Sequence, residues 1–164
     1  MEDALARARS VAAAVCDPEI PVLTIEDLGV LRDVRIGEDG GVEVVITPTY
    51  SGCPAMDAIR EDLRTALAAA GFAPVRLITE LAPAWTTEWM SPEGRRKLAE
   101  FGIAPPRGDR SRSRDGAVPL TLGIRCPQCG SPQTRQLSRF GSTACLSQWV
   151  CEQCREPFDH FKDH

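Results

Sequence analysis

Histidine is scarce in this sequence: two occur among 164 residues, at positions 160 and 164. A nucleophile in the first hundred residues therefore has no histidine close in sequence to act as its base, which disfavours hydrolase chemistry there. Long apolar runs are also missing. The run VAAAVC near the start is much shorter than the roughly 20 residues that span a bilayer, and it lacks a signal-peptide pattern. The sequence predicts a cytoplasmic protein.

An excess of positive charge is absent as well, since the formal net charge is -4. Residues 1–103 carry 10 basic and 17 acidic side chains, and residues 120–164 carry 5 and 4. Non-specific nucleic-acid binding draws on Lys and Arg side chains that neutralise phosphates. This distribution argues against a nucleic-acid partner and favours a protein partner or a small ligand.

Cysteine, in contrast, is plentiful: seven are present, and five of them fall in the last 40 residues. Two C-x2-C pairs, separated by 21 residues, contain Cys126, Cys129, Cys151 and Cys154. Four thiolates at such spacing surround zinc tetrahedrally and form a closed structural site. An iron-sulfur cluster on the same thiolates, or a redox pair, remains an alternative. Cys145 is predicted to be a small buried residue, with a spare ligand or a reactive thiol as alternatives, and His160 and His164 are predicted to be exposed.

The first hundred residues show helical and strand-like patterns in turn. Apolar spacing predicts a helix over 2–15, strands over 30–36 and 42–47 joined by a GEDGG turn, and a helix after Cys53 that stops at Gly71. A third strand is expected within 74–83, and a helix follows with Ser91 as its N-cap. The fold class predicted is α+β, in the order α-β-β-α-β-α. The predicted domains are 1–103, a Pro-, Gly-, Ser- and Arg-rich linker over 104–119, and a zinc ribbon over 120–164.

The stretch TPTYSGCPAMDAIREDL places Cys53 where a strand becomes a helix. The unpaired N–H groups and the dipole of a helix N-terminus stabilise a thiolate there, and Pro54 suits the first helical position. Cys53 is therefore a candidate nucleophile or metal ligand, with packing under the sheet weighed equally. In DPEIP, Asp17 and Glu19 either reach that thiol or a metal or form a turn that ends the first helix. Cys16 is expected to be structural, and Trp85 and Trp89 are expected to pack in the core rather than to line a client surface.

Three segments carry a family resemblance: DPEIPVLTIEDLGVLRDVRI, VEVVITPTYSGCPAMDAI and RLITELAPAWTTEWMSPEGRRKLAEFGI. They resemble the small iron-sulfur assembly domain shared by SufT-like proteins. The segments CPQCGS, FGSTAC and CREPFDHFK resemble the ribbon of one branch, the PaaD components of bacterial phenylacetyl-CoA epoxidase systems. The sequence departs from that branch at Leu146, where Lys is common, and at Asp163, where some relatives have Cys. The second departure argues against another cluster site in the tail.

The resemblance implies an accessory role in aerobic phenylacetate degradation, in the maturation or metal loading of a diiron oxygenase and a flavin and [2Fe-2S] reductase. It implies that Cys53 is the reactive cysteine and that Asp17, Glu19 and Thr49 accompany it. It also implies that Cys126, Cys129, Cys151 and Cys154 hold the ribbon's metal.

Our leading hypothesis is a maturation factor without catalytic activity of its own, in which Cys53 transiently holds iron or an iron-sulfur cluster. A second protomer, a small thiol or the client would supply the remaining ligands of the iron or cluster. In the first case the protein would be a homodimer. The ribbon would dock on the client, with Arg135, Arg139, Phe140 and Trp149 as candidate contacts. The alternative is a thiol-based redox or covalent catalyst that uses Cys53, with Cys16 as the resolving thiol.

Overall fold

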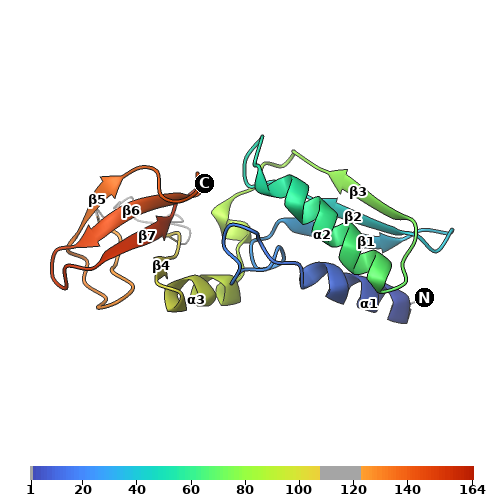
Figure 1. Cartoon of the computed structure of the whole chain (residues 1–164), viewed down its shortest axis with the longest axis horizontal. Coiled ribbons are helices and arrows are strands. Elements are labelled where there is room, and N and C mark those ends of the chain that lie inside the picture. Colours follow the sequence, from blue (N-terminus) through green and yellow to red (C-terminus); the bar gives the residue numbers. More distant parts are fainter. Residues whose placement is uncertain (1, 108–122) are drawn as a thin grey trace, which may run out of the picture. The chain divides into compact units, whose positions relative to one another are not determined.

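The computed structural model describes residues 2–107 and 123–164, which divide into two compact units, Met1–Gly94 and Arg95–His164 (Figure 1). Residues 108–119 of the predicted linker lie outside the described residues. Among the described residues, no helix has both the length and the apolar character needed to cross a membrane.

The first unit contains a three-stranded sheet in the order β1-β2-β3. Strands β1 (Leu31–Ile36) and β2 (Val42–Ile46) form the antiparallel hairpin that the glycine-rich turn predicts. Strand β3 (Val75–Thr79) pairs with β2 in parallel, and helix α2 (Ala55–Ala69) makes the crossover between them. The result is a β-α-β unit, in which the loop after β2 lies at the carboxyl edge of a parallel strand pair.

Two helices cover this sheet. The helix after Cys53 buries the apolar stripe that its spacing predicts, whereas the first helix buries Ala8 and Ala12 but leaves Leu5 39% exposed. Helix α1 (Glu2–Ala13) contacts β1 and α2, and Figure 1 shows α1 and α2 on one face of the sheet. Helix α1 ends two residues earlier than predicted because the chain turns there: the backbone N–H of Ile25 donates to the carbonyl of Val15 at 2.9 Å. In α2 the buried stripe is Met56, Ile59, Leu63 and Leu67.

The segment between α1 and β1 has little regular structure but supplies much of the core. Leu23 and Ile25 are fully buried, and the Trp85 indole N–H donates to the carbonyl of Leu28 at 2.8 Å. Trp85 therefore packs in the core, as expected. Trp89, in the short 3-10 helix η1 (Thr87–Trp89), is only half-buried, and the guanidinium of Arg32 stacks 3.7 Å from its ring centroid.

The second unit is built on a four-stranded sheet in the order β4-β7-β6-β5. Its strands are β4 (Ile103–Ala104), β5 (Thr134–Ser138), β6 (Leu146–Cys151) and β7 (Pro157–Phe161), and helix α3 (Pro92–Glu100) precedes them. The predicted boundary was residue 103, whereas the compact units divide after Gly94. The second unit begins before residue 103 because β4 pairs in parallel with β7 and because the Arg95 guanidinium donates to the carbonyl of Pro106 at 2.7 Å. The predicted α+β class, with a ribbon after the α-β-β-α-β-α order, is confirmed.

Candidate metal centre and reactive cysteine

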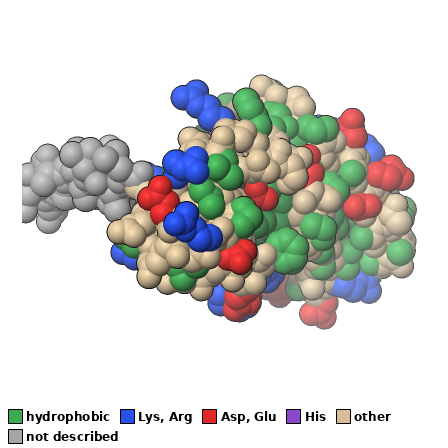
Figure 2. Space-filling view, turned by 60° about the vertical axis from the view of Figure 1, so that its left-hand side comes forward, with side chains coloured by type: hydrophobic (Ala, Val, Ile, Leu, Met, Phe, Trp, Pro, Cys, Tyr) green, Lys and Arg blue, Asp and Glu red, His purple; other side chains and the backbone are tan. Residues whose placement is uncertain are grey.

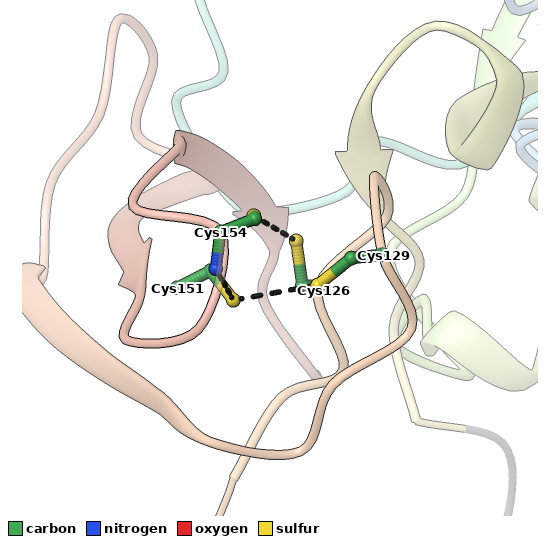
Figure 3. Close-up of side chains that lie close together, drawn as sticks. All are labelled: Cys126, Cys129, Cys151 and Cys154. Atoms are coloured by element: carbon green, nitrogen blue, oxygen red, sulfur yellow. Dashed lines mark hydrogen bonds between the residues drawn. The ribbon is translucent and has the colours of Figure 1, made fainter.

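The four predicted ribbon ligands converge in space. Two turns present them: Cys126 and Cys129 in the turn before β5, and Cys151 and Cys154 in the turn between β6 and β7 (Figure 3). Their sulfurs all lie within 4.8 Å of one another, with Cys126 to Cys154 at 3.7 Å and Cys129 to Cys151 at 3.6 Å. Among the described residues this is the sole set of three or more His, Cys, Asp and Glu side chains close enough to share an ion.

These distances fit one tetrahedral metal ion. Sulfurs bound at about 2.3 Å to a single zinc ion lie about 3.8 Å apart at the corners of a tetrahedron. A disulfide would need the two sulfurs at about 2 Å. The cluster therefore has the donor set and the spacing of a closed structural site, and it leaves no coordination position open for chemistry.

Each pair sits in a tight turn whose backbone supports the thiols. The N–H of Gly130 donates to the carbonyl of Cys126 at 2.8 Å, and the N–H of Arg155 donates to the carbonyl of Cys151 at 3.0 Å. The N–H of Cys154 also points at the Cys151 sulfur, at 3.5 Å. Hydrogen bonds of this kind orient a ligand and favour its anionic form.

The close approach of the thiols shifts their pKa values in opposite directions. The backbone N–H groups of Cys154 and Gln153 lower the pKa of the Cys151 thiol to about 6, although burial opposes this. The N–H of Glu156 favours the Cys154 thiolate, but desolvation and the neighbouring thiols raise the pKa of Cys154 to about 12. Four thiols this close compete for ionisation, and a divalent ion removes the competition by neutralising them.

Cys53 lies in the loop between β2 and α2, at the carboxyl edge of the parallel strands. It is half-buried, its carbonyl accepts the Met56 N–H at 3.2 Å, and no side chain caps the helix. Pro54 has helical backbone angles, with φ −66 and ψ −25. Gly52 has φ +84, and a Cβ there would meet no atom within 4 Å, so a ligand has room to approach this backbone.

The resemblance implies that Asp17, Glu19 and Thr49 accompany Cys53, and these residues lie in two different segments of the first unit. The Thr47 N–H donates to the Val30 carbonyl at 2.9 Å, so the segment before β1 and the loop after β2 leave the sheet at the same edge. Asp17 is engaged in its own turn, where its Oδ1 accepts the N–H groups of Glu19 and Ile20, each at 2.8 Å. This is the geometry of the helix-ending turn that was the alternative interpretation. Burial, and then the charge of Asp17, raise the pKa of Glu19, and Thr49 is half-buried.

The structure does not gather these side chains into a metal site. Cys53, Asp17 and Glu19 form no ligand set of the kind seen in the ribbon, within the part of the chain that the structure describes. Cys16 and Cys145, the two remaining cysteines, differ from each other in exposure. Cys16 was expected to be structural, but its side chain is exposed, while Cys145 is buried, as predicted, and lies outside the ligand cluster.

One prediction about the ribbon is wrong: His160 is buried, with 5% of its surface exposed, rather than being a solvent-exposed tail residue. The side chain lies on β7, whose alternation buries both Phe158 and His160. That period-two pattern in PFDHF was the signal that sequence inspection missed. His164 is exposed, as predicted.

Comparison with known proteins matches both units. Residues 6–72 match the family model described as iron-sulfur cluster assembly protein, and residues 111–162 match the PaaD zinc beta ribbon domain. In Bacillus anthracis, a solved structure described as a domain of unknown function, DUF59, superposes with a TM-score of 0.55 at 26% identity. The match covers 59% of this chain and 92% of that one. The class of protein is thus an iron-sulfur assembly domain joined to a zinc ribbon.

Curated relatives narrow the class to a family. The chain is 49% identical, over 89% of its length and 85% of the relative's, to the Escherichia coli (strain K12) protein named as the D component of 1,2-phenylacetyl-CoA epoxidase. It is 40% identical to an Fe-S protein maturation auxiliary factor of Porphyromonas gingivalis, over 51% of this chain and 80% of that protein. This chain belongs to the PaaD family, which confirms the family resemblance noted in its sequence.

Proposed function

We propose that this protein is an accessory factor that assists the delivery of iron or an iron-sulfur cluster to the oxygenase or reductase components of a phenylacetyl-CoA epoxidase system. The names of its relatives, a component of that epoxidase and two Fe-S protein maturation auxiliary factors, support this role. The protein acts in the cytoplasm, where its clients are assembled, and has no catalytic activity of its own.

The observation that carries the proposal is the position of Cys53. Its thiol lies in the loop that joins β2 to α2, directly before the N-cap residue Pro54, and Gly52 leaves the backbone open. Among the described residues, Cys53 belongs to no group of three or more Cys, His, Asp and Glu side chains close enough to share an ion, so it holds its cargo with ligands from outside the unit. A second protomer, a small thiol or the client supplies them, so transfer needs few bonds to break.

The ribbon has a separate task in this proposal. Its four cysteines hold a structural zinc ion, and the sheet around them docks on a protein client. The face shown in Figure 2 mixes basic, acidic and hydrophobic side chains and has no continuous basic patch among the residues described there, which suits a protein partner better than a nucleic acid. Docking through the ribbon raises the effective concentration of Cys53 at the client.

The alternative, a thiol catalyst at Cys53, draws less support from the structure. A nucleophilic thiol needs a nearby base, and neither histidine of the chain belongs to the unit Met1–Gly94. A peroxidase-type thiol needs a resolving partner, and Cys16 is the one other cysteine of that unit.

The test is the content of iron, zinc and acid-labile sulfide per chain after purification without oxygen, before and after cluster reconstitution. The wild type is compared with Cys53→Ser, with Cys16→Ser as an exposed thiol of the same unit, and with Cys145→Ser as a buried thiol of the ribbon. We expect zinc to stay at about one per chain in all four proteins. Iron and sulfide should be lost in Cys53→Ser alone.

Two results would count against the proposal. If no protein binds iron after reconstitution, the carrier role fails, and Cys53 should be assayed as a peroxide-reducing thiol, with Cys16→Ser showing whether resolution depends on Cys16. If iron binds equally to Cys53→Ser, the cargo resides elsewhere in the chain.

A further inference from the structure

A cavity of about 430 Å³ opens on the ribbon sheet, separate from the cysteine cluster. Part of its lining is cationic, from Arg107, Arg139 and Lys162, and part is aromatic, from Phe140 and Trp149, with His160 among the remaining lining residues. Three of the four residues that the sequence suggested as docking contacts thus meet at one hollow, while Arg135 is not among the residues that line it. A volume of this size is in the range of small-molecule sites.

The lining contains polar atoms whose hydrogen-bonding capacity is not used. Three buried side-chain nitrogen or oxygen atoms lack a partner among the described residues, and two of them, His160 Nε2 and Arg107 Nε, belong to residues that line this cavity. A buried polar group without a partner costs roughly 1 to 3 kcal/mol, so such groups usually meet a water, an ion or a ligand. Because both atoms belong to residues that line the same cavity, we expect a polar ligand there.

The His160 ring is held by its other nitrogen. Ser147 Oγ lies 3.4 Å from His160 Nδ1 and accepts the Trp149 indole N–H at 3.0 Å. The Trp149 and His160 rings meet edge to face, with centroids 6.1 Å apart. This network orients the imidazole. When the Ser147 hydroxyl donates to Nδ1 rather than to the His160 carbonyl, which also lies at 3.4 Å, the neutral ring carries its proton on Nε2 and can donate it to a ligand. Burial, and then the charge of Arg107, lower the pKa of His160 to about 4, so the ring is neutral at neutral pH.

The charge around the cavity favours an anion. Arg107, Arg139 and Lys162 face a single acidic lining residue, Asp163. None of the three cations forms an ion pair with a carboxylate among the described residues. Lys162 instead places its ammonium 5.0 Å from the centroid of the Phe140 ring and donates to the carbonyl of Arg139 at 3.3 Å. The guanidinium groups remain available for a planar, two-oxygen acceptor such as a carboxylate.

The apolar side chains of the lining restrict the chemistry of the ligand further. Phe140 is 69% exposed, and Ile124 and the Trp149 ring complete a hydrophobic side of the cavity. An exposed aromatic beside a cationic hollow suits a ligand that carries its charge next to a flat apolar group. Inorganic phosphate matches the cations but not these walls.

We propose that this cavity binds a carboxylate carried beside a flat apolar group, with the Arg107 and Arg139 guanidinium groups and His160 Nε2 on the carboxylate and with Phe140 and Trp149 on the apolar part. A free aryl acid or the C-terminal residue of another protein offers that chemistry. The site belongs to the unit Arg95–His164 alone and does not depend on cargo at Cys53.

The test is a ¹⁵N NMR titration of the full-length, zinc-loaded protein with N-acetylphenylalanine, and in parallel with its uncharged primary amide. The reporters are the indole N–H of Trp149 and the imidazole of His160, and the indole of Trp85 in the first unit is the internal reference. We expect saturable shifts of both reporters with the acid, and binding of the amide weaker by about tenfold or more. Phenylacetate, and a blocked tripeptide ending in phenylalanine with a free carboxylate, then show whether a small acid or a chain terminus is preferred.

Matched variants separate the cavity from general charge effects. Arg107→Gln and Arg139→Gln should each weaken the acid by about tenfold, whereas Arg135→Gln, which removes the same charge outside the cavity, should leave it unchanged. Zinc content and the dispersion of the amide spectrum confirm that each variant is folded. The proposal is overturned if none of the three aryl carboxylates moves the reporters at about millimolar concentration, if N-acetylphenylalanine and its amide bind alike, or if acetate and inorganic phosphate bind as well as N-acetylphenylalanine.

Discussion

Gly130 and Arg155 occupy equivalent positions, each directly after the second cysteine of its C-x2-C turn, and each has a left-handed backbone with φ +74 and φ +68. Both donate their N–H to the carbonyl of the first cysteine in the turn, at 2.8 and 3.0 Å. Arg155 is the one residue other than glycine with positive φ in the described chain. The same turn is therefore relaxed at one corner of the metal centre and strained at the other.

The first prediction follows from this pair. Arg155→Gly should stabilise the metal-loaded ribbon by about 1 kcal/mol, because glycine adopts a left-handed conformation without the Cβ clash. Gly130→Ala should destabilise it by about 1 kcal/mol, and a Cβ there meets no atom within 4 Å, so the cost is backbone strain alone. Urea unfolding of the zinc-loaded protein measures both. As a control, Arg135→Gly lies within β5, where glycine weakens a strand, and should destabilise.

A second prediction concerns the metal ligands. Cys126→Ser should lose zinc and unfold the ribbon, because binding energy in a closed four-thiolate site is folding energy. Cys145→Ser is the matched control, since both side chains are buried, at 2% and 6% exposure, and Cys145 lies outside the cluster. Metal analysis and the NMR signal of the Trp149 indole report the outcome. Loss of zinc from Cys145→Ser would show that the ligand set is wrong.

The third prediction is a pH dependence that arises at His160. Its ordinary pKa of 6.5 is lowered to about 4 in the folded protein, by burial first and by Arg107 second. The unfolded chain therefore takes up a proton between these values that the folded chain does not, so the stability is complete above pH 6.5 and falls as the pH falls toward 4. Imidazole NMR should show His160 titrating far below 6.5. A midpoint near 6.5 would mean that the ring is accessible to water.

His160→Gln isolates this effect from protonation of the metal ligands. The variant should lose less stability than the wild type between pH 7 and pH 5, measured by urea unfolding at each pH. An identical loss in both proteins would assign the pH dependence to other groups.

A fourth prediction addresses the start of α3. The Ser91 hydroxyl accepts the Gly94 N–H at 2.9 Å and donates to Asp27 Oδ1 at 3.1 Å, so one side chain caps the helix and holds a buried carboxylate. Ser91→Ala should cost about 1 kcal/mol of stability. Asp27→Asn should cost a similar amount, and the double variant should cost less than the sum, because the two groups share a hydrogen bond. Ser10→Ala, at an exposed site on α1, should change stability by less than about 0.5 kcal/mol.

The agreement between sequence and structure is best where the determinants are local. The helical stripe of α2, the glycine turn between β1 and β2 and the Ser91 cap involve residues within a few positions of one another, and all were predicted. The metal centre was predicted as well, although its two cysteine pairs are far apart, because a C-x2-C pair already places two thiols in one turn. The role of Cys53 stays a prediction that the proposed metal analysis tests.

By itself the sequence determined the three helices and three strands of the first hundred residues, the four cysteines that cluster in the ribbon and the family, since periodicity, turn residues and cysteine spacing act over short stretches of chain. Tertiary structure alone decided that β4 joins the ribbon sheet, that Asp27 meets Ser91 and that His160 lies beside Ser147 and Trp149. The physical reason is that those contacts depend on which apolar faces pack together once distant segments meet. No local pattern encodes that choice, and the proposed carboxylate site depends on it.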